Sequence, residues 1–180
     1  ALPISTNSEA VSGLRKRKRR PTKPFAVLFS GISIMQEYLE ISELQIQHFK
    51  SSESPIIVTK IKNKKDLAID EISPNMNTIG AMFPYSGTLK LISKTFGKPL
   101  IATSGNFHGS PICSTTEEAE QILGKIADYF LHNTIEIQHP QDDSVIKFSL
   151  KHQQKLVFRR SRGFAPNYFF AEELSELNKN

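Results

Sequence analysis

The sequence predicts a mixed α/β (α+β) fold, in which a twisted mixed sheet is flanked by helices. Apolar runs of strand length alternate with segments whose apolar residues recur at helical spacing. The last two runs, residues 145–148 and 155–158, are close enough in the chain to pair as an antiparallel hairpin. Interleaved helices and strands with a hairpin favour a mixed sheet. A chain of 180 residues is long enough for one core, so we expect residues 1–180 to form a single domain.

The first expected helix begins near residue 7 and runs into a cluster of basic residues. Thr6 or Asn7 can cap it, with Glu9 in its first turn. Pro21 ends it, because the residue before a proline avoids the helical region. The other elements expected in the first half are a strand at 25–29, a helix in two pieces over 34–50 with Ser42 as the second cap, a strand at 55–61, a hairpin or insertion around 67–72 and an apolar run at 79–83.

The second half is expected to begin with a helix that Ser86 or Gly87 opens and Gly97 ends. Thr115 and Glu118 have the spacing of a capping box and predict the start of another helix. The core residues expected on the first of these helices are Leu89, Leu91, Ile92 and Phe96. The remaining expected elements are strands at 100–102 and 128–131, the hairpin of 145–148 with 155–158, and a charged tail from Glu172 that frays.

The positive charge of the chain is concentrated near its N-terminus. The formal net charge is +5 and the pI is about 9.3. Six consecutive basic residues, 15–20, are followed by Lys23. The helix dipole accounts for one or two cations at the end of a helix. Six of them favour a ligand with several negative charges.

The single cysteine, Cys113, excludes an internal disulfide and a cysteine cluster for zinc or iron–sulfur. We expect it to be a small buried or half-buried residue rather than a nucleophile. No histidine pair has metal-ligand spacing, so we expect no metal site built from side chains alone. No apolar run approaches the ~20 residues of a membrane span, and no signal-peptide pattern is present. We therefore expect a cytoplasmic protein without membrane contact.

Residues 103–106 (Thr-Ser-Gly-Asn) follow the short apolar strand expected at 100–102. Two hydroxyls, a glycine and an amide at the end of a buried strand offer several hydrogen-bond groups, and the glycine lets the backbone approach a phosphate. An ordinary Ser-Gly-Asn turn is the alternative interpretation. His108 lies just beyond and is a candidate to touch a ligand, whereas His132 is expected to be a hydrogen-bonded structural residue.

Three separated segments share the chemistry that a triphosphate site requires, which is fixed cations, hydroxyl or amide donors and a glycine. None is specific alone, and the chain has neither a Walker loop nor a G-x-G-x-x-G motif. The segments are Lys18, Arg20 and Lys23; then Thr103, Ser104 and Asn106; then Asp142, Asp143 and Ser144, followed by Arg159, Arg160 and Arg162.

Together and in this order, the motifs resemble the YrdC-like fold, in particular the YrdC-like domain of the HypF hydrogenase-maturation carbamoyltransferases. The resemblance covers about residues 7–166 and leaves 167–180 as a tail. The segments that carry it are Leu14-Arg-Lys-Arg-Lys-Arg-Arg-Pro-Thr-Lys-Pro-Phe-Ala-Val27, Phe83-Pro-Tyr85, Ala102-Thr-Ser-Gly-Asn106, Gly109-Ser-Pro-Ile112, Ala127-Asp-Tyr-Phe-Leu-His-Asn133, Asp142-Asp-Ser-Val145 and Arg159-Arg-Ser-Arg-Gly-Phe-Ala-Pro166.

The resemblance implies an ATP-dependent adenylation on a basic concave surface. The HypF-type domain makes carbamoyl-adenylate from ATP and carbamate derived from carbamoyl phosphate, and pyrophosphate leaves. Mg²⁺ is implied with the triphosphate, although Asp142 and Asp143 are equally well explained as turn formers, and a hydrogenase-maturation protein is implied as the acceptor. The catalytic residues implied are Lys18 and Arg20, which hold the phosphates, and Ser104 and Asn106, which orient phosphate or carbamate. The nucleotide-binding residues implied are Lys18, Arg20, Lys23, Thr103, Ser104, Asn106, Ser144, Arg159 and Arg162.

Two other functions stay open. Related free-standing enzymes of this fold make threonylcarbamoyl-adenylate from threonine, bicarbonate and ATP for tRNA modification. The third interpretation is a non-catalytic module that binds RNA or a nucleotide through the basic run. The family usually opens with a strand and a K-G-x-G-G-like turn that this chain lacks, so we expect a fragment of a larger protein or a shortened form. Polar or charged groups typical of HypF are missing at Glu53-Ser54-Pro55, Pro84-Tyr-Ser-Gly-Thr-Leu89 and Thr134.

Overall fold

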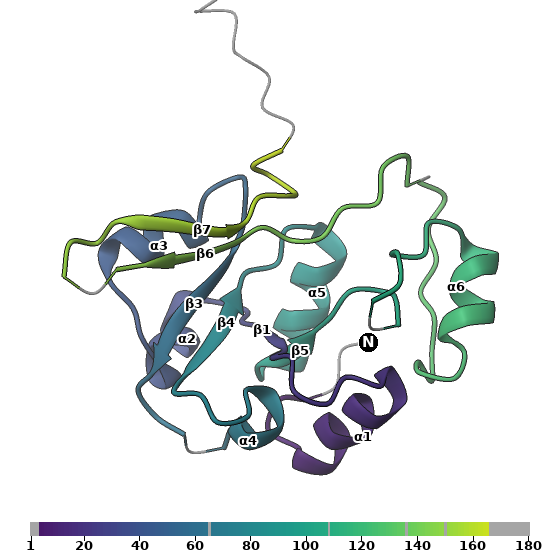
Figure 1. Cartoon of the computed structure of the whole chain (residues 1–180), viewed down its shortest axis with the longest axis horizontal. Helices are drawn as coiled ribbons and strands as arrows, with labels where there is room; N and C mark the ends of the chain where they lie inside the picture. Colours follow the sequence, from purple (N-terminus) through teal and green to yellow (C-terminus); the bar gives the residue numbers. More distant parts are fainter. Residues whose placement is uncertain (1–3, 65, 108, 136, 150, 166–180) are drawn as a thin grey trace, which may run out of the picture.

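The computed structural model describes residues 4–64, 66–107, 109–135, 137–149 and 151–165; the expected tail and His108 lie outside these ranges. The described residues form a seven-stranded mixed sheet with helices on both faces (Figure 1). The elements are α1 (Ser8–Lys18), β1 (Ala26–Leu28), α2 (Ile32–Tyr38), β2 (Leu39–Glu40), α3 (Glu43–Phe49), β3 (Ile56–Ile61), α4 (Ile69–Ile72), β4 (Thr78–Met82), α5 (Gly87–Phe96), β5 (Leu100–Ala102), α6 (Thr116–Leu123), β6 (Val145–Phe148) and β7 (Lys155–Arg159).

The strands lie in the order β5-β1-β4-β3-β6-β7, and β2 pairs with β3 beside this path. β1 pairs with β4, and β3 with β6, in parallel, whereas the other pairs are antiparallel. The register places Ala26 between Gly80 and Ala102, and Val58 on the other side of Gly80. Directly paired residues point to the same side of a sheet. These four positions therefore form one row on one face.

The two faces of the sheet are covered differently. One face carries alternate residues such as Val27 and Ala81 and packs against α1, α2, α3 and α4 to form the main core. On the other face, Leu89 and Ile92 of α5 pack on the row that contains Leu28. The adjacent row, which is the one with Gly80, lines a cavity instead.

The predicted helix caps are confirmed. The Asn7 side chain caps α1 by accepting a hydrogen bond from the Ala10 N–H (3.0 Å). Ser42 and Gln45 form a reciprocal capping box at α3, in which each side chain satisfies a backbone N–H of the other. Gly97 ends α5 with a φ of 69°. Ser86 at α5 and Thr115 at α6 are also caps, and β6 and β7 form the predicted hairpin.

Two element predictions were wrong. Residues 67–72 do not form a hairpin, because Ile69 and Ile72 lie three residues apart on the short helix α4 and are buried together. Residues 128–131 do not form a strand, since no neighbouring strand pairs with them among the described residues. Tyr129 in this stretch is 93% exposed. A short apolar run becomes a strand only where a partner strand lies beside it.

Predictions for two helices also need correction. Leu91 and Phe96 of α5 are exposed, because this helix contacts the sheet along a narrower stripe than the sequence predicts. α1 ends at Lys18, earlier than Pro21 predicts, because Arg19 adopts a left-handed conformation with a φ of 51°. The N–H groups of Arg19 and Arg20 then bond to the carbonyls three and five residues back, which is a Schellman turn. This turn directs Arg20 away from the helix axis.

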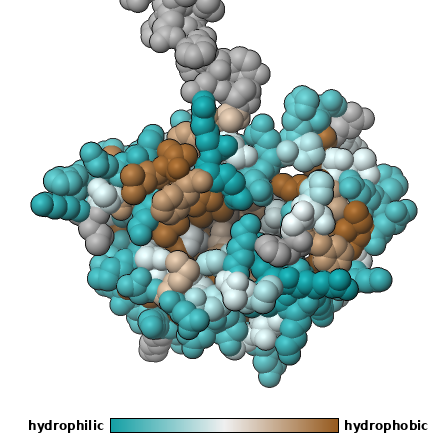
Figure 2. Space-filling model, in the orientation of Figure 1, coloured by the Kyte–Doolittle hydropathy of each residue, from teal (hydrophilic) through white to brown (hydrophobic). Residues whose placement is uncertain are grey.

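The face drawn in Figure 2 is mainly hydrophilic, with hydrophobic residues gathered over the β6–β7 hairpin and near α6. Leu156, Val157 and Phe158 are exposed on this edge strand. Cys113 is buried, as predicted. No helix among the described residues is long and apolar enough to cross a bilayer.

Candidate functional site

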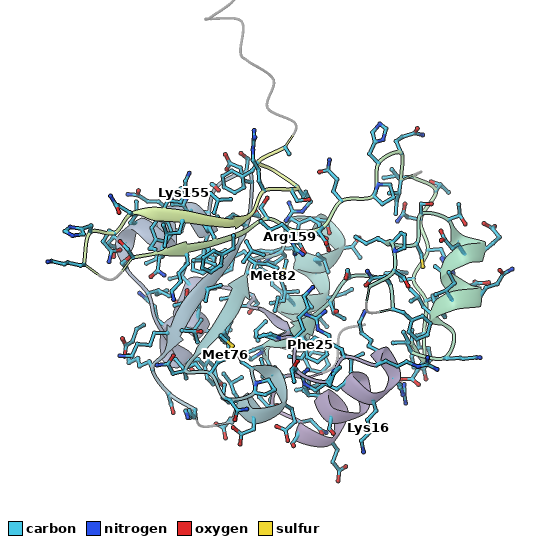
Figure 3. All side chains as sticks on the ribbon, in the orientation of Figure 1. Lys16, Phe25, Met76, Met82, Lys155 and Arg159 are labelled. Carbon is cyan, nitrogen blue, oxygen red and sulfur yellow. The ribbon has the colours of Figure 1, made fainter. Side chains whose placement is uncertain are left out.

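A cavity of about 240 Å³ lies over the row of small residues. Gly80 is essential to its shape, because an added Cβ there would lie 2.7 Å from Cγ2 of Ile56. Arg159 and Phe25, labelled in Figure 3, line the cavity from the C-terminal and N-terminal parts of the chain. The polar and charged residues that line it are Arg20, Lys23, Thr103, Ser104, Asp142, Asp143 and Arg159. The cavity thus combines an apolar floor with cations, hydroxyls and two carboxylates.

Arg20 is held at the cavity by the segment that follows α1. Its guanidinium donates to the carbonyls of Lys23 (3.1 Å) and Pro24 and lies 4.9 Å from the centre of the Phe25 ring. Burial lowers the pKa of Arg20 to about 10, and repulsion from nearby Arg15 adds to the effect. Arg20 is therefore still charged at neutral pH and presents a partly desolvated cation to the cavity.

Lys18 is placed differently from Arg20. The residue is only 2% exposed, and its ammonium donates to the carbonyl oxygens of Ser104 (2.7 Å) and Asn106 (2.6 Å). Lys18 is not among the residues that line the cavity. It instead connects the end of α1 to the turn after β5. Since an ammonium has three donors, one N–H is left beyond these two contacts.

The titration of Lys18 should appear in the pH dependence of stability. Burial is the main reason why its pKa falls from 10.5 to about 8. In the unfolded chain Lys18 keeps its proton up to its ordinary pKa, so between about pH 8 and 10.5 the unfolded state binds more protons. Stability from this group should therefore rise with pH across that window. Relative to Lys18→Met, the wild type should gain on the order of 1–3 kcal/mol in unfolding free energy.

Urea unfolding at several pH values measures this difference. Lys16→Met is the matched control, because Lys16 is an exposed lysine of the same helix. Parallel stability curves for the wild type and Lys18→Met between pH 8 and 10.5 would contradict a lowered pKa.

The turn after β5 is ordered by its own hydrogen bonds. Ser104 Oγ donates to Asn106 Oδ1 (2.8 Å), and Asn106 Nδ2 donates to the Ser110 carbonyl (2.7 Å). Thr103 Oγ1 is buried and has no hydrogen-bond partner among the described residues. A buried unpaired hydroxyl costs free energy. Because Thr103 also lines the cavity, a ligand oxygen could satisfy it.

The third predicted segment contains two ion pairs. Arg159 pairs with Asp142 (3.0 Å) and lines the cavity. Arg162 pairs with Asp143 (2.9 Å) and stacks 3.8 Å from the centre of the Tyr85 ring.

Ser144 holds the two sides of this segment together. Its Oγ donates to the Arg162 carbonyl (2.9 Å) and accepts from the Ser161 N–H (2.8 Å). Ser144 is 0% exposed. Ser144 and Arg162 thus connect the segments on which Asp142 and Arg159 lie, and neither residue lines the cavity.

The structure brings together five of the predicted site residues at the cavity: Arg20, Lys23, Thr103, Ser104 and Arg159. Lys18, Asn106, Ser144 and Arg162 lie in contact with those segments but outside the lining. The small residues that form the floor of the cavity were not identified from the sequence. Gly80, a glycine in the middle of an apolar strand, was the available signal, since such a glycine often marks a close approach. His132 contacts Glu120 (2.9 Å), which agrees with a structural histidine.

Comparison with known proteins identifies the family. The model for Sua5, YciO and YrdC, described as telomere recombination, matches residues 4–161. The chain belongs to the Sua5/YciO/YrdC family. The predicted YrdC-like fold is confirmed by a crystal structure of full-length HypF in a phosphate- and nucleotide-bound form, with a TM-score of 0.86 and 36% identity. That match covers 91% of this chain and 25% of that one.

Two curated relatives show what other family members do. The chain is 36% identical over 162 residues to the carbamoyltransferase HypF of Synechocystis sp., covering 90% of this chain and 21% of the relative. It is 28% identical over 123 residues to the threonylcarbamoyl-AMP synthase of Buchnera aphidicola, covering 65% and 66%. Both relatives are enzymes. The chain spans about a fifth of the length of the carbamoyltransferase.

The residues that line the cavity fit a magnesium-bound triphosphate better than a metal ion held by the protein alone. Among the described residues, no group of three His, Cys, Asp or Glu side chains lies together. Asp142 and Asp143 line the cavity, but each is paired with an arginine. Mg²⁺ usually takes one or two carboxylates together with phosphate oxygens and water.

Proposed function

We propose that the chain binds Mg·ATP in the cavity and adenylates carbamate to carbamoyl-adenylate, as one step of a HypF-type carbamoyl transfer. One observation carries the proposal: Arg20, Lys23 and Arg159 converge on a cavity whose floor is apolar and whose Thr103 hydroxyl is unpaired. Arg20 experiences repulsion from Arg159, which attraction to Asp142 opposes. A polyanion between them would relieve that repulsion and stabilise the complex.

The proposed reaction is a displacement at the α-phosphorus of ATP. A carbamate oxygen attacks this phosphorus, the bond to the bridging oxygen of the β-phosphate breaks, and pyrophosphate leaves with the bonding electrons. Arg20, Lys23 and Arg159 would stabilise the charge that develops on the pyrophosphate. An acceptor of the kind that hydrogenase maturation uses would then take the carbamoyl group, and AMP would leave with the electrons of the broken bond to the phosphate oxygen.

The residues after β5 would orient the reactants. Ser104 and Asn106 are proposed to position phosphate or carbamate, and Thr103 to donate to a phosphate oxygen. Lys18 would hold the turn through its two carbonyl contacts and in this way position the groups that meet the substrate. Ser144 and Arg162 would hold Arg159 in position from outside the cavity lining. Mg²⁺ would be bound mainly by phosphate oxygens, with Asp142 and Asp143 nearby.

A threonylcarbamoyl-adenylate synthase is the second candidate, favoured by the similarity to the Buchnera aphidicola enzyme over 65% of this chain. An RNA-binding module has less support than the basic run suggests. Within that run Arg15 and Lys18 are buried, and Arg17 pairs with Asp128 (2.9 Å). The six charges therefore do not form one continuous exposed cluster.

The deciding experiment is pyrophosphate release from Mg·ATP, after calorimetry has established ATP binding. Three conditions are compared: carbamoyl phosphate, carbamate formed from ammonium and bicarbonate, and threonine with bicarbonate. Release with carbamate is the expected result. Strict dependence on threonine would select the synthase, whereas ATP binding without any release would leave a nucleotide-binding module. Absence of ATP binding would overturn the proposal.

Thr103→Val should separate binding from stability. The substitution removes the unpaired hydroxyl at nearly constant shape, so we expect the unfolding free energy to stay unchanged or rise by up to about 1 kcal/mol. The same change should weaken Mg·ATP binding about tenfold, because a hydrogen bond to a charged phosphate is lost. Calorimetry and thermal unfolding measure the two effects. Thr103→Ser, which keeps the hydroxyl, is the control, and wild-type affinity in Thr103→Val would exclude a phosphate contact.

A further inference from the structure

Arg15 is a buried arginine that neither lines the cavity nor pairs with a carboxylate among the described residues. Its guanidinium instead donates to backbone carbonyls of two segments. Nη1 bonds to the carbonyls of Arg20 (2.8 Å), Pro21 (3.3 Å) and Lys23 (3.1 Å). The other two contacts are Nη2 to the Ile72 carbonyl (3.1 Å) and Nε to the Glu71 carbonyl. Arg15 thus fastens the segment after α1 to the end of α4.

Arg15 and Arg20 are connected through shared neighbours. Both guanidinium carbons lie over the Phe25 ring, 4.6 Å and 4.9 Å from its centre. Both arginines also donate to the Lys23 carbonyl. Any change in the position of Arg15 therefore changes the support of the segment on which Arg20 and Lys23 face the cavity.

The chemistry of Arg15 exceeds what packing alone requires. Burial opposes its charge and lowers the pKa of the guanidinium, and the nearby Glu71 carboxylate offsets only part of this effect. A buried charge without a carboxylate in direct contact is costly. An apolar side chain would fill the space on this helix face without that cost. A planar fork with five donors, however, can hold several carbonyls in fixed positions at once.

We infer that Arg15 is a positioning residue for the anion site: it fixes the segment 20–25 so that Arg20 and Lys23 face the cavity. The inference rests on the proposed function only in naming ATP as the anion. Loss of the Arg15 guanidinium should make segment 20–25 more mobile in the free protein and lower the affinity for ATP. The chemical step should be unaffected once ATP is bound.

The test compares Arg15→Lys with Arg17→Lys. Arg17 lies on the same helix, but its partners are Asp128 and the Ile126 carbonyl. Both partners are far in the sequence from segment 20–25. In Arg15→Lys, amide hydrogen exchange of residues 19–25 should become faster without ATP, and the KM for ATP should rise about tenfold with kcat nearly unchanged. In Arg17→Lys neither quantity should change. If Arg15 had a purely structural role, Arg15→Lys would lower thermal stability without raising KM at unchanged kcat.

A double variant and a replacement variant complete the test. In an Arg20→Met background, Arg15→Lys should add much less to the loss of ATP affinity, because the residue through which it acts is gone. If Arg15→Lys does not fold, Arg15→Gln takes its place, since its amide has only two donors and cannot hold the carbonyls of both segments at once. Wild-type exchange at 19–25 and wild-type KM in the replacement would overturn the inference. Absence of ATP binding in the wild type would overturn the proposed function, and hydrogen exchange would still decide the role of Arg15.

Discussion

Gly80→Val is expected to abolish detectable Mg·ATP binding while the protein stays folded. Gly80 lies between Ala26 and Val58 in the row that lines the cavity floor. An added Cβ would contact Cγ2 of Ile56 at 2.7 Å, and the two methyl groups of valine would occupy part of a cavity of only about 240 Å³. Overpacking of this kind costs about 1–3 kcal/mol, and the preference of valine for strands offsets part of it.

Calorimetry should therefore show at least about a hundredfold loss of affinity, which corresponds to about 2.7 kcal/mol. Gly13→Ala is the matched control, because Gly13 lies in α1 and a Cβ there meets nothing within 4 Å. The double variant Gly80→Val with Ile56→Ala relieves the clash and should recover stability without recovering full affinity. Wild-type affinity in Gly80→Val would show that ATP binds elsewhere.

Arg20→Met is expected to weaken Mg·ATP binding by about 10- to 100-fold, the scale of a lost charge-assisted contact of about 1.5–3 kcal/mol. Arg20 is the cation of the basic run that lines the cavity, and its burial reduces screening by salt. Methionine keeps most of the apolar stem, so the effect should come from the charge and its hydrogen bonds.

Lys16→Met is the control for the loss of one positive charge on the same segment. Lys16, labelled in Figure 3, lies on α1 and is exposed away from the cavity. It should leave affinity nearly unchanged at 0.15 M salt, where exposed charges beyond about 8 Å are screened. Equal losses in the two variants would mean that net charge, rather than the placement of Arg20, determines binding.

Much of the local structure could be predicted from single residues. Asn7, Ser42, Ser86 and Thr115 identify helix starts because their side chains satisfy N–H groups that a helix leaves free. The hairpin of β6 and β7 follows from two apolar runs joined by a short turn. These features depend on neighbours in the chain, which is why sequence patterns are sufficient.

The helical spacing of α1 also contained information that went unused. Val11, Leu14, Arg15 and Lys18 are spaced as one helix face, and all four are buried. The spacing alone could have separated Arg15 and Lys18 from the exposed Lys16. What it could not supply is the identity of their acceptors, which are carbonyls of α4 and of the turns after α1 and β5.

The sequence by itself determined the fold class, the family and the three segments that surround the site, because local patterns and the order of the motifs depend only on the order of the residues. The tertiary structure decided which members of those segments line the cavity. Strand order places Gly80 between β1 and β3, and the left-handed turn at Arg19 directs Arg20 away from α1. Both depend on contacts between residues far apart in the sequence. Packing buries Arg15 and Lys18 against backbone carbonyls, whereas Arg20 donates to the Lys23 and Pro24 carbonyls and also lines the cavity.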